Sequence, residues 1–161
     1  MRGFVIEEYE NALCADLAAA SAARDARVEV PGDHKAWAEY SARGFSQNGE
    51  PDEPLVFAAL LMASHPQVTP LLLRVNGVAA TTGCLAVEDD GIAAFFASST
   101  LAESRGRGYH RAMIEDRLAR AKVAGATLVR ATAGVGTTSE RNFRRCGFDV
   151  LYTRSTWALF E

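Results

Sequence analysis

The sequence predicts an α+β domain in which helices flank a mixed, mostly antiparallel, twisted sheet. Two observations support this class. Three β-rich segments, at residues 71–75, 78–87 and 92–100, are joined by short turns and therefore form an antiparallel meander. A helical segment with clear periodicity, residues 108–124, follows the meander, and strand and helix signals alternate after it. The 161 residues are enough for one hydrophobic core.

The N-terminal part of the chain gives mixed signals. Residues 4–6 favour a strand, whereas the alanine-rich stretch that runs to residue 23 favours a helix. We expect an extended strand that is followed by a helix or a loop. Residues 1–26 are therefore treated as an N-terminal extension of a domain at residues 27–161, which opens on a short strand at residues 27–30.

Two helices are expected between this short strand and the meander. Asp33 caps the first helix, which runs to about Arg43 and ends at Gly44. The second helix begins at Pro54 and covers residues 55–64. It is apolar nearly all round, so we expect it to be buried on several sides. The polar loop between the two helices carries three acidic side chains, Glu50, Asp52 and Glu53.

The remaining elements follow from turn and cap signals. The pair Asn76-Gly77 predicts a tight hairpin within the meander. The buried stripe of the periodic helix is expected at Ile114, Leu118 and Ala121. A strand at residues 127–132, a short helix that Ser139 caps and a final strand at residues 149–160 complete the domain.

The composition excludes several kinds of protein. The net charge of −3, from 17 basic and 20 acidic residues, lacks the basic excess of a nucleic-acid binder. No apolar run approaches the roughly 18 residues that span a bilayer. The cysteines and histidines are scattered and the N-terminus shows no signal-peptide pattern, so we expect no metal site, no disulfide framework and a cytoplasmic location. The charge is uneven, because residues 105–145 hold ten basic and three acidic side chains, a net +7 that leaves −10 for the rest.

The most informative segment lies between the meander and the periodic helix and reads Arg105-Gly106-Arg107-Gly108-Tyr109-His110. Glycines let successive backbone N–H groups turn toward one point, the helix adds its positive dipole end, and the arginines add charge. This combination suits a phosphate or a pyrophosphate, although a simple basic, glycine-rich loop has the same composition. The segment lacks the third glycine of a dinucleotide fold and the Gly-Lys-Ser/Thr of a P-loop, so neither motif is present.

The segment resembles the Arg-x-x-Gly-x-Gly/Ala acetyl-CoA signature of the GNAT superfamily of N-acetyltransferases. Downstream, Ser139-Glu140-Arg141-Asn142 followed by Cys146-Gly147-Phe148 is similar to the second cofactor element of that family. The order of the elements expected over residues 27–160 agrees with the family as well. The resemblance implies a GNAT-like fold, and the last part of the chain looks like the C-terminal half of tandem GNAT proteins.

The resemblance also implies a site for acetyl-CoA, as co-substrate, without a metal. The backbone N–H groups from Gly106 to His110 would hold the pyrophosphate, and the strand edge at residues 99–101 would pair with the pantetheine arm. Ser139 would contact the cofactor or only cap its helix. The implied cofactor-binding residues are Ser99, Thr100, Leu101, Arg105, Gly106, Arg107, Gly108, Tyr109, His110, Ser139, Asn142 and Arg145.

Two positions depart from the family pattern. The last signature position is usually small but is His110 here, and the position of the proton-donating tyrosine in many relatives is Phe143. Tyr152 on the final strand is the candidate general acid, with a half-buried strand aromatic as the alternative interpretation. The strand before the signature offers no base, so catalysis is expected to depend on orientation and on backbone N–H groups near Leu101.

The loop between the first two helices lines the acceptor site in such folds. Glu50, Asp52 and Glu53 would therefore steer a cationic amine, although a solvated loop with a helix cap explains the same residues. We expect an N-acetyltransferase that transfers acetyl from acetyl-CoA to the primary amine of a small molecule by direct attack in a ternary complex. A CoA- or acyl-CoA-binding regulatory or assembly module without turnover is the alternative. Neither nucleic acid nor a membrane is expected as a partner.

The family usually ends with two strands after Gly-Phe, whereas one strand fits here. We expect residues 3–14 to supply the missing strand, either from the same chain or from a partner. The sequence therefore predicts a homodimer or a strand exchange through the N-terminal segment.

Overall fold

The computed structural model describes residues 3–20, 22–46 and 48–160. Within these ranges, seven strands form one sheet in the order β2-β3-β4-β5-β6-β1-β7. The strands are β1 (Gly3–Asp16), β2 (Val28–Glu29), β3 (Val68–Val75), β4 (Val78–Val87), β5 (Ile92–Thr100), β6 (Leu128–Gly134) and β7 (Asp149–Phe160). The helices are α1 (His34–Phe45), α2 (Glu53–Ser64), α3 (Tyr109–Val123) and α4 (Thr138–Arg145), and a 3-10 turn, η1 (Ala102–Ser104), follows β5.

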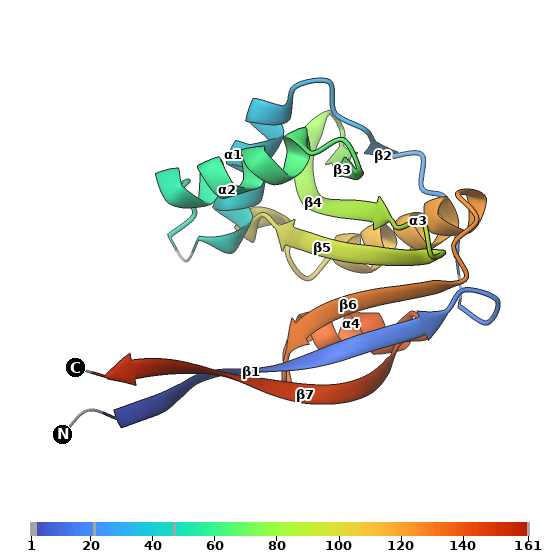
Figure 1. Cartoon of the computed structure of the whole chain (residues 1–161). Coiled ribbons are helices and arrows are strands. Elements are labelled where there is room, and N and C mark those ends of the chain that lie inside the picture. The colour runs from blue at the N-terminus through green and yellow to red at the C-terminus, as the bar shows by residue number, and fades with distance from the viewer. Residues whose placement is uncertain (1–2, 21, 47, 161) are drawn as a thin grey trace.

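The helices cover both faces of this sheet, with α1 and α2 on one face and α3 and α4 on the other (Figure 1). Neighbouring strands are antiparallel except β5 and β6, which run parallel. The first face is centred on Trp37, whose indole N–H donates to the Leu71 carbonyl at 2.8 Å. On the second face the expected stripe Ile114, Leu118 and Ala121 is completely buried. These features confirm the predicted α+β class and the mostly antiparallel sheet.

Local signals placed the central part of the chain correctly. Val75 pairs with Val78 across a two-residue hairpin loop in which Asn76 and Gly77 have φ of 52° and 80°. Such positive values are what this tight turn requires, and Asn and Gly adopt them most readily. The Asp33 side chain caps α1 by accepting a hydrogen bond from the backbone N–H of Ala36 at 3.0 Å.

The N-terminal segment is the expected strand followed by the loop alternative in the described residues, but the strand is longer than the signal at residues 4–6 indicated. It is one strand of 14 residues, β1, with Asn11, Leu13 and Ala15 buried in alternation. β1 lies between β6 and β7 and pairs with both. Residues 3–14 therefore supply the missing strand from the same chain in this structure. Residues 1 and 2 of the extension lie outside the described residues, as do residues 21, 47 and 161.

The first half of β1 and the second half of β7 form a two-stranded arm. β6 pairs with β1 only from Glu10 onward, so the residues before Tyr9 pair with β7 alone. The arm projects from the body of the protein, and Gly3 pairs with Phe160 at its tip (Figure 1). Large apolar side chains that are more than half exposed on it are Phe4, Tyr9, Trp157 and Leu159.

The second helix is less buried than its apolar sequence predicts. Ala59 and Ala63 are its buried residues, whereas Phe57 and Leu61 are 64% and 59% exposed. The helix packs its alanine side on α1 and β3, and no described element covers the opposite side. The expectation of burial on several sides was therefore wrong for α2.

Candidate active site

The sheet opens where its two parallel strands part. β5 and β6 pair from Ile92–Leu128 to Phe95–Ala131, and no pair follows in the described residues. On its other side β5 stays paired with β4 as far as Thr100. The last part of β5 therefore has one free edge, which is able to accept an added extended segment.

A β-bulge marks the beginning of this free edge. Thr82 pairs with Ser99 and Cys84 with Phe96, so Gly83 faces two residues, Ala97 and Ser98. Ala97 has φ of 49°, a left-handed conformation that is unfavourable for a residue with a Cβ atom. The bulge turns the backbone of β5 just where β6 leaves it.

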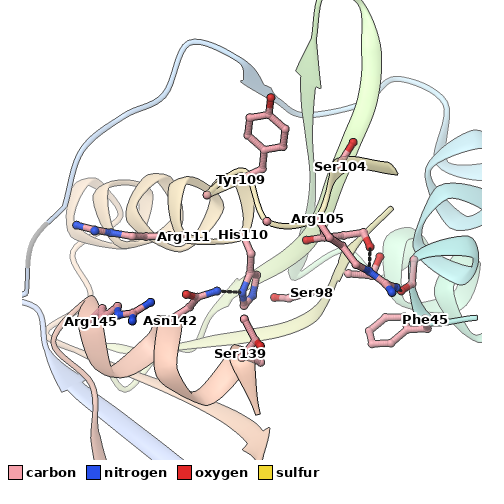
Figure 2. Close-up of a pocket in the computed structure, with 16 residues that line it drawn as sticks. Phe45, Ser98, Ser104, Arg105, Tyr109, His110, Arg111, Ser139, Asn142 and Arg145 are labelled. Atoms are coloured by element: carbon pink, nitrogen blue, oxygen red, sulfur yellow. Dashed lines mark hydrogen bonds between the residues drawn. The ribbon is translucent and has the colours of Figure 1, made fainter. Parts of the chain in front are cut away.

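A cavity of about 740 Å³ lies against the free edge. Its walls are the end of α1, residues 98–100 of β5, the loop before α3, the first turn of α3 and one side of α4 (Figure 2). No Asp or Glu is among the described residues that line it. Arg145 lies exposed at its rim, and Arg111 lines it while pairing with Glu115 at 2.9 Å.

The glycine-rich loop has the geometry that an anion site needs. Gly106 and Gly108 have φ of 73° and 80°, and Gly108 is the N-cap of α3. No side chain of the described residues caps α3, so the N–H groups of its first turn remain available to a ligand. Arg105 does not extend freely: its guanidinium donates to the carbonyls of Thr100 at 3.1 Å and Gly44 at 3.0 Å. Arg105 therefore fastens the loop to β5 and α1.

The structure brings together most of the residues that were assigned to the cofactor. Those that line the cavity are Ser99, Thr100, Arg105, Gly106, Gly108, Tyr109, His110, Ser139, Asn142 and Arg145. Arg107 is an exposed residue of the glycine-rich loop and does not line the cavity. Leu101 is buried, and its backbone N–H donates to the Ala80 carbonyl at 3.0 Å. That N–H is therefore not the free donor that catalysis was expected to use.

Ser139 belongs to the cavity wall rather than to the helix cap. The hydroxyl of Thr137 accepts from the backbone N–H of Glu140 at 3.2 Å and so caps α4. Ser139 lies in the first turn and points toward the cavity with Asn142 (Figure 2).

His110 lies inside the cavity with its ring fixed by α4. Nδ1 of His110 and the side-chain amide nitrogen of Asn142 are 3.1 Å apart, and the ring packs edge-on against Phe143 with centroids 5.8 Å apart. Its Nε2 is buried and has no hydrogen-bond partner among the described residues. Burial, together with the Arg117 charge, lowers the pKa of His110 to about 4. The imidazole is therefore neutral at pH 7.

The predicted catalytic and acceptor residues are not gathered in this cavity. Tyr152 is 59% exposed on the edge strand β7, and β6 and β1 separate β7 from β5. It is not brought to the cavity. Glu50 and Asp52 line a second hollow of about 600 Å³, whereas Glu53 does not line this hollow. The second hollow begins at Ser46, directly after Phe45, which lines the cavity.

Several cavity residues were not singled out in the sequence. Arg111 directly follows His110, and Thr138 directly precedes Ser139. Their position next to the two motifs was therefore the signal that could have identified them. Gly44 and Phe45 come from α1, and no local pattern links that helix to a loop some 60 residues later.

In the described part of the chain, no group of three His, Cys, Asp or Glu side chains is arranged to hold a metal. No described helix is long and apolar enough to cross a membrane.

The fold recurs in solved structures. A GNAT-family putative acetyltransferase from Novosphingobium aromaticivorans matches 98% of this chain and 66% of its own, with a TM-score of 0.69 and 15% identity. A GCN5-related N-acetyltransferase from Sphaerobacter thermophilus matches 98% of this chain and 53% of its own, with a TM-score of 0.72 and 18% identity. A fungal structure described as a GCN5-related glucosamine N-acetyltransferase region matches with a TM-score of 0.61 and 14% identity over 98% of this chain and 21% of its own.

These likenesses confirm the predicted GNAT fold. The chain spans less than two thirds of the length of the three proteins, and the resemblance to a tandem half stays a prediction. No protein-family model and no curated protein matches the sequence.

Proposed function

We propose that this chain is an acetyl-CoA-dependent N-acetyltransferase that acts on the primary amine of a small molecule. The observation that supports it most is the free edge of β5, which lies in one cavity with the uncapped N-terminus of α3. An extended arm with amide groups can pair with such an edge, and a pyrophosphate can bind at such a helix end. Acetyl-CoA has both parts in one molecule.

The described residues fit this ligand. Backbone N–H groups of residues 106–110 would hold the pyrophosphate, and Arg107 and Arg145 would supply charge near it. The β5 edge from Ser98 to Thr100 would pair with the pantetheine arm, and Asn142 would contact it from α4. The bound thioester would supply an activated acetyl group, while these residues orient it and exclude water.

The acceptor is proposed to enter from the second hollow. Glu50 and Asp52 line that hollow, and their carboxylates would attract a cationic amine. A small amine is consistent with the similar fungal structure, which is named as a glucosamine N-acetyltransferase region. The amine must lose a proton before it attacks in the ternary complex, and a base or a water chain would accept that proton.

Calorimetry with acetyl-CoA tests the binding step. Arg145→Glu should weaken binding about tenfold, because it replaces a cation at the rim by an anion, and the loss should shrink at high salt. Arg130→Glu is the matched control, since Arg130 is an exposed arginine that pairs with Glu88 outside the cavity. Equal effects of the two substitutions would argue against a phosphate at this rim.

Release of free CoA thiol across a panel of amines tests turnover. It separates the enzyme from the alternative of a CoA-binding module, which the absence of carboxylates in the described cavity lining favours. A Glu50→Gln, Asp52→Asn double variant should raise KM for a cationic acceptor and leave the affinity for acetyl-CoA unchanged. An unchanged KM would exclude steering by these carboxylates.

We also propose a cytoplasmic homodimer, whose contact would involve the apolar arm of β1 and β7. Light scattering measures the mass in solution directly. A monomer at all concentrations would contradict the dimer and leave the other proposals untouched.

A further inference from the structure

One arginine of α3 is completely buried beside the cavity. Arg117 is 0% exposed, and no carboxylate lies within ion-pair distance of it in residues 3–20, 22–46 and 48–160. Its neighbour Asp116 pairs instead with Arg24, at 2.8 Å, and with Arg120. A buried, unpaired cation is expensive, so a fold retains one only where other groups accept its hydrogen bonds.

Backbone carbonyls and one hydroxyl accept these hydrogen bonds. The Arg117 guanidinium donates to the carbonyl of Cys84 at 3.1 Å and to the hydroxyl of Ser98 at 2.8 Å. The guanidinium also lies over the ring of Phe95, with Cζ of Arg117 4.6 Å from the ring centroid. Burial lowers the pKa of Arg117 to about 10, which leaves the group cationic at pH 7.

A glycine of β4, Gly83, leaves room for this guanidinium. A Cβ atom at Gly83 would lie 3.2 Å from Nη1 and 3.3 Å from Cζ of Arg117, closer than most such contacts. Gly83 is also the residue that faces the Ala97–Ser98 bulge. The missing side chain at residue 83 and the bulge in β5 thus place Arg117 and Ser98 together.

Ser98 connects this cation to the cavity. It lines the cavity and stands three residues after Phe95, the last residue of β5 that pairs with β6. Because the Ser98 oxygen accepts from Arg117, its own hydroxyl hydrogen is free to point into the cavity. A hydroxyl that accepts a hydrogen bond from a cation is a stronger donor than an isolated hydroxyl.

We propose that Ser98 donates a hydrogen bond to the sulfur of CoA when the acyl group leaves, and that Arg117 is the positioning residue that holds and polarises Ser98. This inference rests on the proposed function. Transfer forms the C–N bond to the amine, breaks the C–S bond and leaves the bonding electron pair on sulfur. Ser98 keeps its proton, the proton of the amine passes to water, and no further co-reactant is needed.

The cavity lining limits which other groups could act as an acid toward the leaving sulfur. The described lining residues include no carboxylic acid, and the neighbouring His110 is neutral at pH 7. Arg117 is the fully buried positive charge beneath this part of the β5 edge, and it reaches the cavity through Ser98.

The pKa of the thiol in bound CoA tests the proposal without any acceptor. Ultraviolet absorbance of the thiolate is followed against pH for free CoA and for CoA that is saturated with protein. The bound thiol should titrate at least about 1 pH unit below the free thiol, since a cation-linked donor favours the thiolate. Ser98→Ala and Arg117→Met should each move the value most of the way back to that of free CoA.

Two further variants keep the result interpretable. Ser98→Thr retains the hydroxyl and should retain the low thiol pKa of bound CoA. Arg130→Met removes an exposed arginine of the same charge and should leave that thiol pKa as in the wild type. Methionine has a similar length and no charge, so it removes the cation and retains most of the packing. If Arg117→Met fails to fold, the comparison of Ser98→Ala with Ser98→Thr still decides.

The possible results separate the two proposals. Absence of CoA binding would overturn the proposed function and this inference together. Binding with a thiol pKa equal to that of free CoA would overturn the inference alone. A lowered thiol pKa that persists in both Ser98→Ala and Arg117→Met would also overturn it, because another group would then be responsible.

Discussion

Replacing His110 by phenylalanine should change how the stability of the protein depends on pH. The His110 ring is enclosed by Asn142 and Phe143, and its Nε2 has no acceptor among the described residues. A proton added to this ring would create a second cation near Arg117 in a poorly solvated place. Burial first, and the Arg117 charge second, therefore lower the pKa of His110 to about 4.

The magnitude follows from the difference between the folded and unfolded states. An unfolded histidine titrates near its ordinary value of 6.5, about 2.5 pH units above the folded one. Between these two values the unfolded chain binds more protons than the folded chain, so stability falls as the pH falls. At about 1.4 kcal/mol per unit, the His110 contribution amounts to about 3 kcal/mol. It is complete above about pH 6.5 and lost when the pH reaches about 4.

Urea unfolding at a series of pH values measures this contribution. The free energy of unfolding of the wild type minus that of His110→Phe should fall by about 3 kcal/mol from about pH 7.5 to about pH 4. Phenylalanine retains the ring and its packing, so a constant difference between the variants reflects packing alone. His65→Gln, at an exposed histidine, is the control. A difference for His110→Phe that does not vary with pH would mean that His110 does not titrate differently in the folded and unfolded states.

Four further substitutions, at three positions, test the cavity wall, the bulge beside it and the helix that leads to it. Gly44→Ala would place a Cβ atom 2.3 Å from the hydroxyl oxygen of Ser99, so it should cost about 2 kcal/mol in thermal unfolding and weaken acetyl-CoA binding. Ala97→Gly should stabilise the bulge or leave its stability unchanged. Ala97→Val should destabilise the protein by more than about 1 kcal/mol, because a β-branched residue is unfavourable in the left-handed conformation. Equal melting temperatures of these two variants would contradict this expectation. Asp33→Ala should cost about 1 kcal/mol through the lost cap on Ala36 and leave acetyl-CoA affinity unchanged, which calorimetry measures.

The parts of the fold that the sequence predicts well depend on neighbouring residues. The meander was predicted because the two adjacent residues Asn76 and Gly77 determine the type of the hairpin turn. β1 was predicted only in part, because its partners lie more than 100 residues away. Leu13 pairs with Ala131 and Val150, and these distant pairings override the helix preference of the alanine-rich stretch. The exposed face of α2 has a similar origin, because only the tertiary arrangement decides which side of an apolar helix finds a partner.

The candidate site divides in the same way. The glycine-rich loop is contiguous, so its chemistry can be predicted from six residues. Arg117 follows a charged residue and precedes the core residue Leu118, and nothing nearby in the sequence distinguishes it from a solvated arginine. Its burial depends on Gly83 and Ser98, which two other strands contribute. Long-range packing of this kind leaves no local pattern.

Acetyl-CoA is proposed to bind along the free edge of β5 and at the N-terminus of α3. Amide hydrogen exchange with and without acetyl-CoA tests this claim residue by residue. Bound acetyl-CoA should slow exchange at residues 98–100 and 106–110 and leave β2 and the arm of β1 and β7 unchanged. Unchanged exchange in these two segments at saturating acetyl-CoA, or protection confined to another part of the chain, would contradict it.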